Sequence, residues 1–180
     1  MYTEIQSQKR TGQLPTERVG SLKETMGTMR NNVINHARMK MPLPLQNEEL
    51  SRLFERRDFI QYFRHALAHE IALVLGTYDQ HVQAVYLFDE SINPDAETED
   101  YLPQVDLTIH LLLKVTSNSA ALGAFITSLD RALTEELREM PGSFAGYTSF
   151  LDVIPITEQA IQERRGYAAL LSSIYARPLK

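Results

Sequence analysis

Residues 104–115, QVDLTIHLLLKV, restrict the fold of this chain more than any other segment, because apolar and polar side chains alternate along them. A β-strand points successive side chains to opposite faces of its sheet, whereas a helix would spread the same residues around its axis. One face collects only aliphatic residues, and the other collects Asp106, Thr108, His110 and Lys114 beside Leu112. The segment is therefore predicted to be a strand with one buried and one wetter face.

The rest of the chain from residue 45 to 180 predicts an α+β domain around this strand. Apolar runs rich in β-branched and aromatic residues predict two further strands, at 82–88 and 149–156. Helical spacing of apolar residues predicts helices that include residues 60–74, 119–140 and 157–178. We expect a small mixed sheet of three or more strands with helices packed on it.

Residues 1–44 are predicted to form a separate basic arm. They contain seven Lys or Arg and three Glu, a net charge of +4, so the remaining residues carry −9 of the total of −5. A basic arm on an acidic body suggests docking on an acidic surface, such as another protein or the body of a second copy. The alternative is that a sparse polar tail simply has this composition.

The arm contains one predicted amphipathic helix. After a capping box at Ser21, apolar residues recur at helical spacing, and MPLPL at 41–45 ends the pattern. Such a helix is marginal alone and needs a covering surface, either a neighbouring chain or the body itself. The residues predicted to bind a partner are Leu22, Met26, Met29, Val33, Arg30 and Arg38.

Composition narrows the protein classes. The chain has no cysteine, which removes disulfides and thiolate metal sites and fits a reducing cytoplasm. The start has no apolar stretch typical of a signal peptide, and no run approaches the ~20 apolar residues that span a membrane. The acidic body argues against a broad nucleic-acid surface. We expect a cytoplasmic protein without a cofactor, a membrane partner or a nucleic-acid partner.

Three pieces, AVYLFDES, VDLTIHLLL and FLDVIPIT, resemble the acid-bearing strands of nucleotidyltransferase-fold proteins. The resemblance implies a nucleotide and magnesium held by Asp106 and Asp152. Two-metal transfer needs paired carboxylates, yet Asp106 is flanked at two-residue spacing by Gln104 and Thr108. The first strand also lacks the glycine that lets backbone approach a phosphate. A divergent or inactive member of this fold is the alternative hypothesis.

The same strands fit a second resemblance without catalytic acids. HVQAVYL, LTIHLLLKV, FLDVIPI and SSIYARP are similar to the C-terminal domain of enhanced serine sensitivity protein B, over residues from about 81 to 178. This resemblance implies a domain that binds partners and has no catalytic residues. The ending Tyr175-Ala176-Arg177-Pro178 departs from the family pattern, and the arm has no counterpart in it.

Two smaller patterns are candidate metal sites. His65 and His69 lie four residues apart, on one face of the predicted helix, where two imidazoles can chelate a transition metal. The acidic residues of the 89–100 segment could supply oxygen ligands for calcium, but they lack EF-hand spacing. Two surface histidines and a solvated connection are the simpler explanations, so no metal site is predicted, with His65 and His69 kept as candidate ligands. The function predicted from the sequence is a non-catalytic interaction or assembly module that forms a homo-oligomer.

Overall fold

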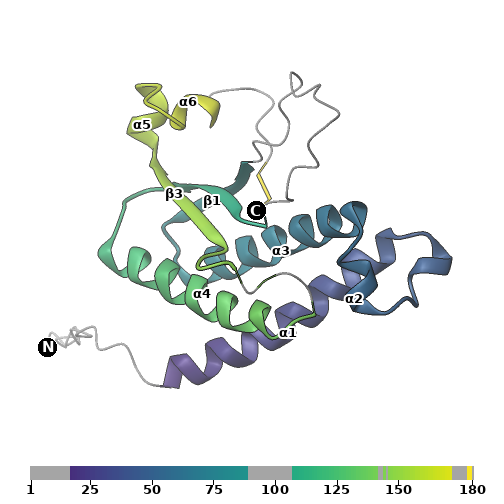
Figure 1. The fold of residues 1–180 in the computed structure, drawn as a ribbon. Helices are drawn as coiled ribbons and strands as arrows, with labels where there is room; N and C mark the ends of the chain where they lie inside the picture. The colour runs from purple at the N-terminus through teal and green to yellow at the C-terminus, as the bar shows by residue number, and fades with distance from the viewer. Residues whose placement is uncertain (1–16, 89–106, 142–143, 145, 172–177, 180) are drawn as a thin grey trace, which may run out of the picture.

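The computed structural model describes residues 17–88, 107–141, 144, 146–171 and 178–179. Within them, helices and strands follow the predicted α+β order (Figure 1). Their bounds are α1 Glu17–Lys40, the 3-10 helix η1 Leu43–Leu45, α2 Leu50–Leu53, α3 Arg57–Tyr78, β1 Val82–Phe88, β2 Ile109–Val115, α4 Ala120–Arg138, β3 Leu151–Thr157, α5 Glu158–Gln162 and α6 Ala168–Leu171.

The sheet is mixed and has the order β1-β2-β3. β1 and β2 are antiparallel, and β2 and β3 are parallel with Ile109 aligned on Leu151. The crossover between the parallel strands is α4. Its N-cap is Ser119, whose hydroxyl oxygen accepts a hydrogen bond from the N–H of Leu122 at 3.1 Å. β3 is an edge strand, and this position tolerates Pro155, as the sequence predicts.

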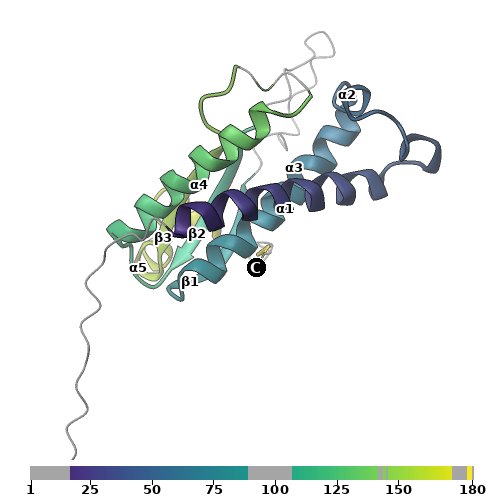
Figure 2. The same ribbon diagram turned by 90° about the horizontal axis from the view of Figure 1, so that it is seen from below.

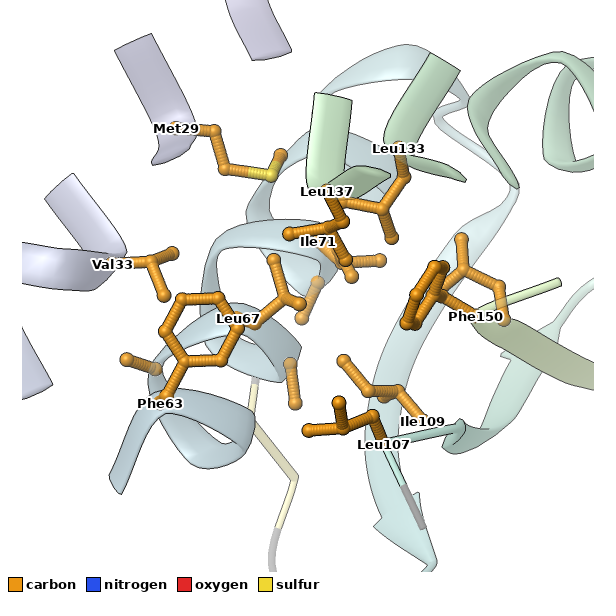
Figure 3. Close-up of a cluster of buried hydrophobic side chains, with 14 of the residues drawn as sticks. Met29, Val33, Phe63, Leu67, Ile71, Leu107, Ile109, Leu133, Leu137 and Phe150 are labelled. Carbon is orange, nitrogen blue, oxygen red and sulfur yellow. The ribbon is translucent and has the colours of Figure 1, made fainter. Parts of the chain in front are cut away.

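One face of the sheet is covered by a layer of three long helices. α3 and α4 lie against the sheet, and α1 crosses over both of them (Figure 2). The apolar face of β2 is buried there, as its alternation predicts, and it meets aromatic and aliphatic side chains from the helices (Figure 3). Labelled members of this core are Phe63, Leu67, Ile71, Leu133, Leu137 and Ile109.

α1 belongs to this core, although the sequence predicts a separate arm. Met26, Met29 and Val33 are buried against α3 and α4 of the same chain. The core also continues through Met41 and Leu53, on either side of the predicted boundary at residues 44 and 45. The sequence leaves two covering surfaces open for this helix, a neighbouring chain and the body, and in the structure the body covers it. α1 also begins at Glu17, so Ser21 lies inside the helix and is not its cap.

The other face of the sheet is covered more thinly. Leu112, Ile156 and Ala168 form a small buried cluster under α5 and α6 (Figure 1). The predicted single C-terminal helix is interrupted between these two short helices, where Arg164 and Gly166 have positive φ values of 51° and 49°. Glycine adopts that conformation without strain, so Gly166 suits the interruption. None of the helices in the described residues is long and apolar enough to cross a membrane.

Candidate functional site

The residues predicted to bind a partner are engaged within the chain. Met26, Met29 and Val33 have exposed fractions of 2%, 3% and 0%, and Leu22 is half-buried against the same core. Arg30 forms an ion pair with Glu136 of α4, with 2.7 Å between Nη1 and Oε1. The predicted docking stripe therefore faces inward, because its apolar residues pack on the hydrophobic core of the same chain.

Arg38 has a local structural role. Its Nη1 donates hydrogen bonds to the backbone oxygens of Gln46 and Glu48, at 2.8 Å and 2.9 Å. Gln46 in turn donates from its side-chain amide to the Met41 carbonyl at 2.9 Å. These bonds hold the turn that follows α1 and satisfy carbonyl groups that would otherwise need water.

The outward face of the helical layer carries a different set of residues. On α3, Tyr62, His65, His69 and Leu73 follow one another at spacings of three, four and four residues, so they lie on one side of the helix. We call these four residues the outer stripe. Both imidazole residues are exposed, and Tyr62 and Leu73 are 41% and 40% exposed. The stripe therefore presents an aromatic and an aliphatic side chain at its ends and two imidazoles between them.

A groove runs between α1 and α3 beside the outer stripe. Its volume is about 250 Å³, and its walls include His36 and Lys40 from α1 and Tyr62, His65 and His69 from α3. Next to Lys40, Met39 is 75% exposed, and Leu43 on η1 is 79% exposed. In the described part of the chain, no hydrogen bond or ion pair engages either imidazole of the stripe.

The acid predicted for a metal site on β3 has an imidazole as its partner. The parallel register aligns Asp152 with His110, and Oδ2 lies 3.0 Å from Nδ1. Phe88 of β1 is aligned with His110 on its other side. Asp106 and the acidic 89–100 segment lie outside the described residues. The residue that β2 aligns with Asp152 is therefore a histidine.

Metal ligands do not gather into a complete site within the described residues. No group of three or more His, Asp or Glu there is arranged to hold a metal ion. His65 and His69 are the pair that the sequence indicates, and their neighbour His36 lines the groove from α1 without completing such a group.

The outer stripe was not predicted from the sequence as a surface. The signal is present: Tyr62 and Leu73 fall outside the core stripe of α3, which runs through Phe63, Leu67 and Ile71. Two large side chains outside the core stripe of one helix indicate a second apolar face.

Comparison with protein-family models, with curated proteins and with solved structures found no match to this chain. The two resemblances drawn from short motifs therefore stay predictions.

Proposed function

We propose that this chain is a non-catalytic assembly module, and that its partner is a second copy of the chain bound at the outer stripe of α3. The observation that supports the proposal is the exposure of Tyr62 and Leu73, which lie at the two ends of one helical face. Tyrosine is enriched in protein interfaces because it buries a large surface while keeping a polar group at its tip.

The outer stripe is suited to a contact with itself. In a two-fold symmetric contact the same surface is used by both copies, and residue i meets residue j while j meets i. Two antiparallel copies of α3, related by an axis that passes outside the helix at the level of residue 67, bring Tyr62 of one copy to Leu73 of the other. Tyr62 of each copy would then cover Leu73 of the other copy, and the contact removes both side chains from water.

The test is sedimentation velocity of the full chain over a wide range of protein concentrations, in buffer without chelator. We expect a concentration-dependent dimer that the double substitution Tyr62→Ser/Leu73→Ser weakens. The chain offers a matched control in Tyr167→Ser/Leu170→Ser, because these residues are similarly exposed, at 46% and 45%, but lie in the α5–α6 region. Equal weakening by both variants would contradict the proposed surface.

The nucleotidyltransferase hypothesis is tested on the same protein. Magnesium with a nucleoside triphosphate should leave the melting temperature of an assembly module unchanged, whereas a ligand that binds only the folded state raises it. A rise that Asp152→Asn removes would contradict a non-catalytic module and favour nucleotide binding.

A further inference from the structure

We infer that His65 and His69 form half of a transition-metal site, which a second copy of this chain completes. This inference rests on the proposed assembly through the outer stripe and names what would bind there. It starts from the spacing of the two histidines on α3, a 22-residue helix that spans Arg57–Tyr78.

Residues four apart on a helix stand above one another on the same face. Two imidazoles in this relation can bind one metal ion, as the two histidines of helical zinc sites do. His65 and His69 are both exposed, and in the described residues neither ring is held by a hydrogen bond or an ion pair. Both rings are therefore free to turn a nitrogen toward an ion in solution.

The ligand type indicates the kind of metal. Neutral imidazole nitrogen suits zinc, copper and nickel, whereas calcium and magnesium require oxygen ligands. Zinc in structural sites takes four ligands in a tetrahedron, so two histidines fill only half of its coordination sphere. Within the described part of the chain, no third ligand is placed to join them.

Symmetry supplies the missing ligands. The two-fold contact that brings Tyr62 to Leu73 also brings His65 of one copy opposite His69 of the other, because both pairs are centred near Leu67. Four imidazoles, two from each copy, then surround one position on the axis. The apolar residues at both ends of the stripe would shield this position from water, which strengthens the bonds to the ion.

The experiment uses the full chain and zinc alone as the probe. The protein is first treated with a chelator, and zinc is then titrated while sedimentation velocity records the mass of the species. We expect the average mass to double when one zinc ion is present for every two chains. The substitutions His65→Ala and His69→Ala should each abolish this doubling without unfolding the protein, because both side chains are exposed.

Two histidine variants serve as controls. His36→Ala removes the imidazole that α1 contributes to the same groove, and His81→Ala removes an exposed imidazole that hydrogen-bonds Thr116 at 2.9 Å. Both variants should dimerise with zinc as the wild type does. If His36→Ala also abolishes the doubling, α1 supplies a ligand and a site made of four imidazoles from α3 is wrong.

The remaining outcomes separate the two proposals. Association of equal strength in chelator and in zinc would overturn the metal site and leave the assembly surface standing. A monomer under both conditions would overturn both. Equilibrium dialysis measures zinc binding directly. Zinc that binds without any change in mass would overturn the inferred site, because a single chain would then be enough to hold the ion.

Discussion

The two faces of the sheet are covered to different depths. On one face, the cluster of buried residues draws on α1, α3, α4 and the apolar side of β2 (Figure 3). On the other face, the buried cluster consists of Leu112, Ile156 and Ala168, beneath two short helices. We call the face under the three long helices the thick side and the face under α5 and α6 the thin side. The thick side supplies most of the hydrophobic stabilisation, since that contribution grows with the apolar area removed from water.

The difference shows how one strand serves two environments. β2 buries Ile109, Leu111 and Leu113 on the thick side, whereas its thin side carries His110 and Lys114 around a single buried leucine. These polar residues pair across the sheet edge, His110 with Asp152 and Lys114 with Glu158, whose Nζ and Oε2 are 2.6 Å apart. A thin cover leaves these polar pairs partly exposed to water beside the sheet.

The largest expected effect comes from the same substitution made on each face. Ile71→Ala removes a fully buried side chain from the thick side and should lower the free energy of unfolding by about 4 kcal/mol, since the surrounding helices cannot close the cavity. Ile156→Ala, on the thin side, should cost about 2 kcal/mol, because a small cluster near the sheet edge relaxes more easily. Urea denaturation measures both, and equal costs would contradict the difference between the faces.

A second comparison concerns α1, where one helix carries a buried and an exposed methionine. Met29→Ala should lower the free energy of unfolding by about 3 kcal/mol, because Met29 is packed against α3 and α4. Met39→Ala changes the same residue type at 75% exposure and should cost less than about 0.5 kcal/mol. If α1 were an arm that binds only a partner, both variants would unfold like the wild type in dilute solution.

The strands and the fold class could be predicted because their signals are local. Alternation identified β2, and the apolar runs identified β1 and β3 within two residues of their observed ends. The alignment of His110 with Asp152 could not be predicted, because it depends on the register of two strands separated by α4. Spacing within one strand carries no information about register between strands.

The same limit explains the treatment of α1. Its apolar stripe of Met26, Met29 and Val33 shows that one face must be covered, and the sequence leaves open whether the cover is the same chain or another. The net positive charge of residues 1–44 favours an external partner. In the structure, the acidic partner of Arg30 is Glu136, more than one hundred positions along the chain.

The smallest expected effect is a pH dependence at the start of α3, on the surface of the thick side. Arg56 donates to Asp58 through Nε and Nη2, at 3.2 Å and 3.0 Å, and the Phe59 N–H donates to the same carboxylate at 2.9 Å. The hydrogen bond from the Arg56 guanidinium lowers the pKa of the Asp58 carboxyl below its usual range, and the Phe59 amide acts in the same direction.

The sign of the effect follows from that direction. Because the folded protein holds the Asp58 carboxyl at a lower pKa than the unfolded chain does, the stabilisation is complete above the ordinary pKa of about 3.9. It is lost as the pH falls through the lower pKa of the folded state. Asp58→Asn should therefore lower the melting temperature slightly at neutral pH and have no effect in strong acid.

The effect is small because water competes for both side chains, whose exposed fractions are 40% for Arg56 and 44% for Asp58. Glu55→Gln is a suitable control, since it neutralises an exposed carboxylate one residue from Arg56. Melting temperatures of the three proteins should converge in acid and separate near neutrality, with only Asp58→Asn below the wild type. A difference that persists at the lowest pH would assign the role of Asp58 to the shape of its side chain and not to its charge.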